Sequence, residues 1–439
     1  MQVDKVTIQD IGILDNQESK GLASHLDFCK TNGGRLQWIH FLTNPLETLA
    51  SIEAREEAIQ IMLKHKDFLD QMKISNGTCL VIDQFYSTAY KTIPKHISFP
   101  GAYWYRFWNK TDYALISYSV QHLVSFVQSL HQFIEQIKGD QHTPILNSII
   151  EPIKKHIEGL DCLQTDVKKL KNDPQAILAL GYFFNHQYKT EIKLLQKQFY
   201  ILDAFYSMAS AMKHFKFNFP TWVEQNSPMI EFEDAVHPLV QNAIGSDLSL
   251  VEAKRFLFLT GANMAGKSTF IKTVGILAYL AHIGMGVPAK RCKLTLLDGL
   301  ITNLTTSDNI LKGESYFFNE VQRIKHTLTK VMDGKKYLIL IDELFKGTNI
   351  IDAMKCSTKV IEGLQALNQS LCILSTHLYE ISEGLKTYPH IQFCYFETAV
   401  VNKALVFNYT LKEGVSQDRL GYLILEREGV VDLIERINT

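Results

Sequence analysis

The residues with the most specific chemistry form a glycine-rich segment in the second half of the chain. Residues 261–268 read Gly-Ala-Asn-Met-Ala-Gly-Lys-Ser, which has the spacing G-x-x-x-x-G-K-[ST] of a phosphate-binding loop. Glycines at these positions let the backbone curl until successive N–H groups face the phosphates, and the helix that follows adds partial positive charge at its N-terminus. The spacing therefore predicts that this segment binds the phosphates of a nucleotide.

Two side chains of this glycine-rich loop have separate predicted roles. Lys267 is expected to reach the β- and γ-phosphates, and the Ser268 hydroxyl is expected to ligate Mg²⁺. The other predicted contacts to the cofactor come from the rest of the loop and the start of the helix: Gly261, Ala262, Met264, Ala265, Gly266 and Thr269.

A second polar cluster ends the apolar run 337–341. Asp342 directly follows this run and suits the Mg²⁺ sphere beside Ser268. Glu343 is the next residue and is predicted to act as the general base that polarises the attacking water. A carboxylate pair of this kind is informative because it follows the phosphate loop in the right order.

A third polar cluster, Ser-Thr-His at 375–377, follows the apolar run 371–374. A histidine at a strand end is commonly just a hydrogen-bonded polar residue. Opposite a γ-phosphate site, however, we expect His377 to sense the phosphate. Lys267, Glu343 and His377 are therefore the predicted catalytic residues.

The elements that position these clusters are short apolar strands. The runs 256–259, 337–341 and 371–374 are separated by helical stretches, one of them from Ser268 to about His282. That alternation predicts a mostly parallel sheet covered by helices, and ligands bind beyond the carboxyl ends of such strands. Because all three polar clusters follow a strand, the sequence predicts that they form one site.

The first half of the chain has a different pattern of apolar residues. Between Asp112 and Met212, apolar residues recur at steps of three and four, which predicts three long helices that fold back on one another at the turn segments 139–144 and 171–174. Their apolar stripes are Leu123, Phe126, Leu130, Phe133 and Ile137; Leu146, Ile150, Ile153, Ile157 and Leu160; and Leu195, Phe199, Leu202, Tyr206 and Ala209. An ordinary bundle and a projecting arm both fit this pattern.

The aromatic run Tyr-Trp-Tyr-Arg-Phe-Trp at 103–108 precedes these helices. Aromatic side chains dominate protein cores, so we expect the run to fill a core. A stacking surface or a partner surface is the alternative.

Composition limits the class of protein. The chain has 439 residues, 46% of them apolar, and a formal net charge of −1, which excludes a disordered chain and a protein that coats nucleic acid by bulk positive charge. The sequence shows neither a membrane span nor a signal peptide. Seven cysteines without a C-x-x-C pair indicate reduced thiols and a cytoplasmic location, and argue against a zinc finger.

The segment 260–289 is similar to the ATPase domain of the MutS family of DNA mismatch-repair proteins. The resemblance rests on Asn263-Met264 within the loop and on the Gly284…Val287-Pro288-Ala289 tail. Further blocks in matching order are His-Pro-Leu-Val at 237–240, Ser-Asp-Asn at 307–309 with Gly-Glu-Ser-Tyr-Phe at 313–317, Asp-Glu-Leu-Phe-Lys-Gly-Thr-Asn at 342–349, and Ser-Thr-His-Leu-Tyr-Glu at 375–380.

The resemblance extends upstream to residues 22–55, which look like the start of the family's helical core. It implies an α+β multidomain protein, with an all-α core and lever domain at 1–218 followed by an α/β P-loop ATPase domain of the ABC type at 219–439. Residues 219–439 would correspond to domain V of the family.

The resemblance also implies an ATP-driven, Mg²⁺-dependent homodimer with composite sites. Ser315 would contact the γ-phosphate bound to the other subunit, and Asn263 would join the phosphate contacts. The helices between 112 and 212 would be levers that lead to a clamp on double-stranded or branched DNA.

Three departures from the family pattern are visible. The chain starts where the helical core starts, so we expect the mismatch-recognition and connector domains to be absent and mismatch selectivity to be weak. The position of an adenine-stacking aromatic in some members falls near Ala243. Lys346 stands where that loop usually carries arginine, and lysine lacks the bidentate geometry of a guanidinium.

Three functions remain open on the sequence. The first is a MutS-like ATPase that clamps DNA as a dimer. The second is the same ATPase acting on a protein partner without a direct DNA role, which the near-neutral charge allows. The third is a P-loop kinase, which leaves Glu343, Ser315 and the long helices without a purpose.

Overall fold

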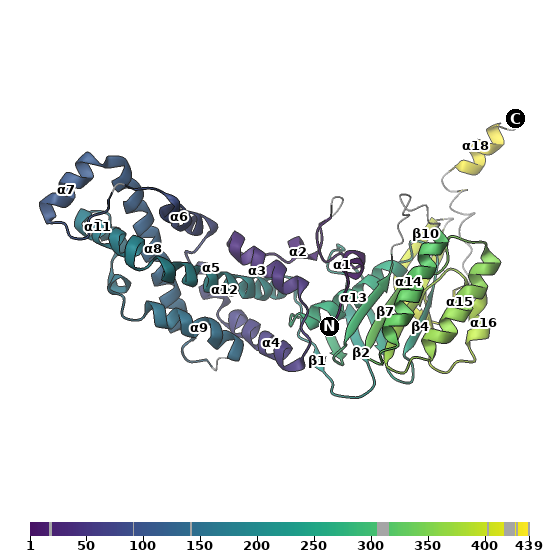
Figure 1. The fold of residues 1–439 in the computed structure, drawn as a ribbon. Helices are drawn as coiled ribbons and strands as arrows, with labels where there is room; N and C mark the ends of the chain where they lie inside the picture. The colour runs from purple at the N-terminus through teal and green to yellow at the C-terminus, as the bar shows by residue number, and fades with distance from the viewer. Residues whose placement is uncertain are drawn as a thin grey trace. The chain divides into compact units, whose positions relative to one another are not determined.

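The computed structural model describes residues 1–16, 20–90, 92–140, 143–304, 316–401, 404–416, 426 and 429–437 (Figure 1). The chain divides into two compact units, which are described separately. Unit 1 consists of Met1–His25, Pro45–Ile52 and Phe215–Thr439, and unit 2 consists of Leu26–Asn44 and Glu53–His214. Unit 2 is helical and unit 1 contains two mixed sheets, so the predicted α+β class is confirmed.

Unit 2 is built from helices joined by short turns. They are α3 (Asn32–Thr43), α4 (Leu49–Lys64, which begins in unit 1), α5 (Lys66–Gln71), α6 (Asn76–Ser87), α7 (Phe99–Trp108), α8 (Lys110–Ile137), α9 (Pro144–Ile157), η1 (Asp161–Gln164), α10 (Val167–Leu170), α11 (Pro174–Tyr182), η2 (Phe183–Gln187) and α12 (Lys189–Phe215).

The three longest predicted helices correspond to α8, α9 and α12. The apolar stripe of α8, from Leu123 to Ile137, is buried along its whole length. Thr143 caps the N-terminus of α9 by accepting a hydrogen bond from the Leu146 N–H, and Asp173 caps the N-terminus of α11 in the same way, which explains why a helix begins at the end of each predicted turn segment. The spacing of apolar residues therefore predicted these three helices, except that α9 ends at Ile157, before Leu160, and that the short elements η1, α10, α11 and η2 between α9 and α12 were not predicted.

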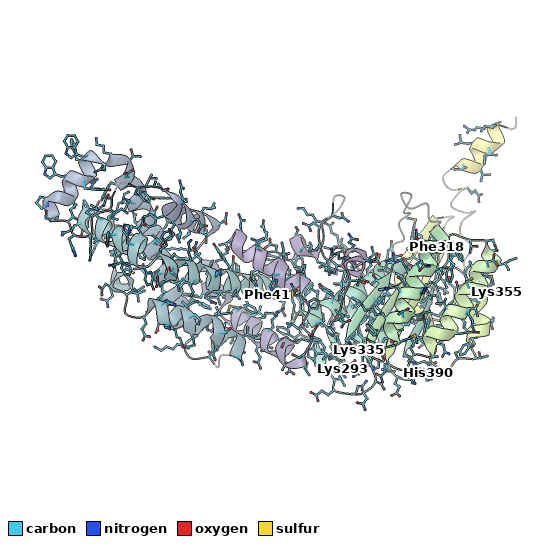
Figure 2. The ribbon with its side chains drawn as sticks, in the orientation of Figure 1. Phe41, Lys293, Phe318, Lys335, Lys355 and His390 are labelled. Carbon is cyan, nitrogen blue, oxygen red and sulfur yellow. The ribbon has the colours of Figure 1, made fainter. Side chains whose placement is uncertain are left out.

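The interior of unit 2 also holds charged groups. Phe41 of α3, labelled in Figure 2, lies under the guanidinium of Arg55, whose Cζ is 4.5 Å from the ring centroid. Asp203 of α12 is buried and accepts hydrogen bonds from the backbone N–H groups of Lys30 and Thr31, each at 2.9 Å. These contacts fix the start of α3 against α12.

The prediction that the aromatic run 103–108 fills a core is wrong. The run lies on α7, where Ala102 is buried and most of the aromatic rings face outward. The physical reason is that a helix of ten residues can turn only one side to its neighbours, and in α7 the small residue occupies that side.

Unit 1 contains a six-stranded and a four-stranded sheet. The six-stranded sheet has the order β10-β9-β4-β8-β7-β6, and the four-stranded sheet has the order β1-β5-β2-β3. The strands are β1 (Thr221–Trp222), β2 (Ile230–Ala235), β3 (Ser246–Leu250), β4 (Phe256–Thr260), β5 (Arg291–Leu294), β6 (Gly299–Asn303), β7 (Tyr337–Asp342), β8 (Ser370–Ser375), β9 (Ile391–Val401) and β10 (Ala404–Glu413).

Strands β4, β6, β7, β8 and β9 are parallel, and β10 pairs with β9 antiparallel. All five residues of β4 are buried, because helices cover both faces of a parallel sheet. This burial explains why its residues form a continuous apolar run rather than an alternating pattern, and the predicted parallel sheet is confirmed.

Unit 1 also contains helices. They are α1 (Lys5–Asp10), α2 (Leu22–His25), α13 (Lys267–His282), α14 (Tyr316–Val331), α15 (Ile350–Gln365), η4 (Tyr379–Ile381), α16 (Ser382–Leu385) and α18 (Val430–Ile437). No helix of the described residues is both long enough and apolar enough to cross a lipid bilayer.

The N-terminal residues belong to the sheet unit. Gln2 forms a bridge with Gly299, and the buried carboxylate of Asp10 accepts hydrogen bonds from Thr302 Oγ1 at 2.7 Å and from the Leu304 N–H at 3.1 Å. The compact units therefore differ from the predicted division at 218/219. The difference arises because α1 satisfies polar groups of β6 nearly 300 positions away.

Candidate functional site

The three polar clusters meet at the carboxyl ends of β4, β7 and β8. In the sheet, Ser375 at the end of β8 is paired with Leu259 of β4 on one side and with Asp342 of β7 on the other. The strand order thus places residues from three distant parts of the sequence at one edge, as the alternation of strands and helices predicted.

The glycine-rich loop joins β4 to α13. Gly261 and Gly266 have φ of +137° and +104°, a backbone region that side chains disfavour. Lys267 is buried, and its ammonium donates to the carbonyl oxygens of Gly261 at 2.7 Å and Ala262 at 3.0 Å. Burial lowers the pKa of Lys267, opposed by the charges of Glu343 and Asp342. The ammonium therefore lies inside the curl of the loop.

Ser268 and Asp342 lie side by side. Ser268 Oγ donates to Asp342 Oδ2 at 2.5 Å, and Ser375 Oγ donates to the other carboxylate oxygen, Oδ1. A hydroxyl and a carboxylate are oxygen donors of the kind that Mg²⁺ prefers, together with water and phosphate oxygens. The donor set therefore fits the predicted magnesium ligands, Ser268 and Asp342.

Glu343 lies beside a lysine and a histidine. Its carboxylate is 3.1 Å from Lys346 Nζ and 3.6 Å from His377 Nδ1. The interaction with His377, followed by the charge of Lys346, lowers the pKa of Glu343 to about 2 in spite of its burial. Glu343 is therefore ionised at neutral pH, as a general base must be, and all three predicted catalytic residues lie at the same edge.

The sequence did not indicate Glu320 of α14. This buried carboxylate accepts hydrogen bonds from the backbone N–H groups of Lys346 at 3.2 Å and Gly347 at 3.3 Å. Glu343 and Phe345 in the same loop have φ of +59° and +60°, which is strained for residues with a side chain. Glu320 thus stabilises a strained loop that carries the predicted base.

A cavity of about 520 Å³ opens beside the glycine-rich loop. Its lining includes Asn263, Met264, Thr269 and Glu343, and a second wall is formed by His237 and residues 240–244. The burial of His237 at this wall lowers its pKa to about 4, so the imidazole is neutral at physiological pH. The cavity is large enough for a nucleotide.

Tyr409 of β10 is a second residue that the sequence did not indicate. Its side chain lines the cavity and is 44% exposed, and a Cβ on Gly266 would lie 3.2 Å from its Cδ1 atom. The β9–β10 register shifts between Phe407 and Leu411, where Tyr409 has φ of +51°. An irregularity in the ladder thus directs an aromatic ring toward the loop.

Ser315 lies outside the described residues, as do the neighbouring segments 307–309 and 313–314. Its predicted contact to the phosphate of a second subunit stays a prediction.

Comparison with known proteins agrees with the resemblance. The family model for MutS domain V matches residues 257–436. The DNA mismatch repair protein MutS of Petrotoga mobilis (strain DSM 10674 / SJ95) is 30% identical over 255 residues, which cover 57% of this chain and 31% of the relative. Residues 257–436 therefore belong to the family of MutS domain V. The aligned segment thus spans about a third of the relative's length.

Most of the site lies within the match to domain V. The glycine-rich loop, Asp342, Glu343 and His377 fall within residues 257–436, and so do Glu320 and Tyr409. The wall formed by His237 and residues 240–244 precedes the match and completes the cavity.

Proposed function

We propose that this chain binds ATP and Mg²⁺ at the glycine-rich loop and hydrolyses the γ-phosphate. The observation that supports the proposal best is the convergence of residues from two strand ends beside one cavity: Lys267 and Ser268 after β4, and Asp342 and Glu343 at the end of β7. The buried ammonium of Lys267, the exposed hydroxyl of Ser268 and the two half-buried carboxylates at this edge match the needs of phosphoryl transfer.

Each residue has a role in this proposal. Mg²⁺, when bound by Ser268 and Asp342, neutralises charge that develops on the phosphates. Lys267 turns its ammonium from the loop carbonyls toward the phosphate oxygens. Glu343 accepts the proton of the attacking water, and His377 holds the Glu343 carboxylate and contacts the γ-phosphate.

The proposal continues to an ATP-controlled homodimer on DNA. Ser315 of each copy would complete the site of the other. Exposed lysines of unit 2, such as Lys155, Lys168, Lys169 and Lys171, would contact DNA phosphates, which positions a protein without reading bases. The expected partner is double-stranded or branched DNA, bound without strong mismatch selectivity.

Binding titrations of the full chain against matched, mismatched and branched duplexes test this proposal, at two salt concentrations and with and without a non-hydrolysed ATP analogue. We expect binding that weakens with salt, changes with the analogue, and differs by less than about tenfold between matched and mismatched DNA, about 1.4 kcal/mol. Size measurement in the same buffers tests for the dimer.

Two results would contradict the proposal. ATPase activity without DNA binding in any condition would favour an ATPase that acts on a protein partner. A monomer with full ATPase activity in the presence of ATP would exclude the composite site.

A further inference from the structure

Helix α7 presents a continuous aromatic surface to solvent. Five rings, Phe99, Tyr103, Trp104, Phe107 and Trp108, are between 44% and 72% exposed. At 100° per residue they cover about half of the circumference of the helix, opposite the buried Ala102. We call these five side chains the α7 aromatic face. On a protein surface, a patch of five adjacent exposed aromatic rings indicates an interaction site.

Hydrogen bonds at its N-terminus hold α7 in place, so the packing of the helix leaves the α7 aromatic face exposed. Ser98 caps α7 by accepting a hydrogen bond from the Gly101 N–H, and Gln175 of α11 donates to the Ile97 carbonyl at 3.0 Å. Figure 1 shows α7 at one end of unit 2 beside α11. Neither contact involves the rings of the face.

The charges around the α7 aromatic face are mainly positive. Lys95, Arg106 and Lys110 are exposed, and Lys110 Nζ lies 5.4 Å from the ring centroid of Phe107. Residues 92–122 contain a single carboxylate, Asp112, and the adjacent helix α11 contributes a second, its N-cap Asp173, so three cations face two carboxylates. Burial and then the charge of Asp112 raise the pKa of Tyr105, a half-buried residue that is not part of the exposed aromatic arc. The face is therefore complementary to a polyanion.

We propose that the α7 aromatic face stacks on unpaired bases of DNA, and that Lys95, Arg106 and Lys110 contact the phosphates on either side. Every base has a flat π-surface, so aromatic rings interleaved with cations bind single strands with little sequence preference. The exposed arc is aromatic rather than aliphatic, which favours bases over lipid chains. This inference rests on the proposed DNA-binding function and names the DNA that it would prefer: a branch or flap with a single-stranded segment.

Fluorescence anisotropy with the full chain tests the proposal, using labelled oligo(dT) of about 20 nucleotides, a blunt duplex, and the same duplex with a single-stranded flap. The test variant is Trp104→Ala combined with Trp108→Ala. We expect it to bind oligo(dT) and the flap at least about tenfold more weakly than the parent, with blunt-duplex affinity unchanged. Trp108→Phe keeps a ring and should bind within about threefold of the parent.

Leu36→Ala combined with Leu80→Ala is the matched control, because both leucines are exposed apolar residues of unit 2. Intrinsic fluorescence gives a second readout, since Trp38 is buried and Trp222 half-buried, whereas Trp104 and Trp108 are exposed. Oligo(dT) should quench the emission of the parent, and the quenching should disappear when both exposed tryptophans are replaced by phenylalanine.

The outcomes separate this inference from the proposed function. Equal oligo(dT) affinity of parent and test variant, or a parent that binds blunt duplex and not oligo(dT), would overturn the inference and leave duplex binding intact. A test variant that loses binding to phosphatidylserine vesicles but keeps its DNA affinities would overturn it in favour of a membrane surface. Ring-dependent oligo(dT) binding without ATPase activity would support stacking and refute the ATP-driven mechanism.

Discussion

Ser268 and Asp342 are 74 positions apart in the chain and are joined by a hydrogen bond of 2.5 Å between Ser268 Oγ and Asp342 Oδ2. Ser268 lies at the start of α13, which follows β4, and Asp342 ends β7. Strand β8 separates β4 from β7 in the sheet, and Ser375 at its end binds the other oxygen of the same carboxylate. The Asp342 carboxylate is therefore the point at which the three polar clusters join.

Glu343→Gln should retain ATP binding and lose hydrolysis. The substitution keeps the shape of the side chain and removes the proton acceptor, and a general base contributes roughly 100-fold to 10,000-fold to a rate. We expect single-turnover hydrolysis to slow by about this factor while the Kd of a fluorescent ATP analogue changes little.

Lys267→Ala is the contrasting variant for Glu343→Gln. It removes the buried cation of the loop, so it should weaken ATP binding by about tenfold to a hundredfold, the effect of a charge-assisted hydrogen bond of about 1.5–3 kcal/mol. Lys335 lies just before β7, at the end of the strand away from Asp342, so Lys335→Ala is a control that should change neither ATP binding nor hydrolysis. Equal loss of ATP binding in the Glu343 and Lys267 variants would contradict the separate role of Glu343.

Glu320→Ala should lower kcat at least about tenfold with a smaller effect on KM, because the loop that carries Glu343 loses two backbone hydrogen bonds of about 1 kcal/mol or more each. Hydrogen exchange at residues 343–347 should become faster in the same variant. Glu320→Gln retains one carbonyl acceptor, so its kcat should lie between those of Glu320→Ala and the parent. A loss of global stability with unchanged kcat in the remaining folded protein would assign Glu320 a purely structural role.

Tyr409→Ala should weaken ATP binding by about tenfold if the ring packs against the bound base, since aromatic stacking contributes about 1–3 kcal/mol. Tyr409→Phe should bind almost as well as the parent, because the ring remains. Val406→Ala, at another exposed position of β10, is the control. Affinities for ATP and for inorganic triphosphate separate the base from the phosphates: the Tyr409→Ala effect should vanish with triphosphate, and an equal effect on both ligands would contradict base contact.

Acid should destabilise the sheet unit through His282. This histidine is fully buried; its Nδ1 lies 2.7 Å from the Ala278 carbonyl oxygen and its Nε2 accepts from the Leu297 N–H at 3.0 Å, so the ring is neutral. Burial lowers the pKa of His282 to about 4 from an ordinary 6.5. The unfolded state therefore binds the proton first, and the stabilisation is complete above pH 6.5 and is lost as the pH falls toward 4.

Between pH 7.5 and pH 5 this linkage predicts a decrease of about 2 kcal/mol in the free energy of unfolding. His282→Gln keeps one donor and one acceptor and does not titrate, so its unfolding midpoint should be lower at pH 7.5 and should fall less toward pH 5. His237 is shifted in the same direction and is unchanged in the variant, so the difference between the two proteins isolates His282. Identical pH dependence in both proteins would contradict this assignment.

The sequence by itself determined the parts of this protein that depend on local spacing. The glycine-rich loop is defined by eight consecutive residues, 261–268. The runs before Asp342 and His377 are apolar because a parallel strand is buried on both faces. The stripe from Leu123 to Ile137 follows the period of a helix. These features could be predicted because each depends on neighbours in the chain. The same is true of the residues predicted to contact the phosphates, to ligate Mg²⁺ and to act as the general base.

Only the tertiary structure decided which distant groups satisfy one another. Glu320 holds the loop at Lys346 and Gly347, Tyr409 reaches the cavity through an irregular β10, and Asp10 joins the N-terminus to β6. None of these contacts has a periodic signature, because each is set by the pairing of buried polar groups or by the register of strands far apart in sequence. The exposure of the α7 aromatic face has the same origin: composition favours a core, and only the packing of Ala102 determines which side of the helix is buried.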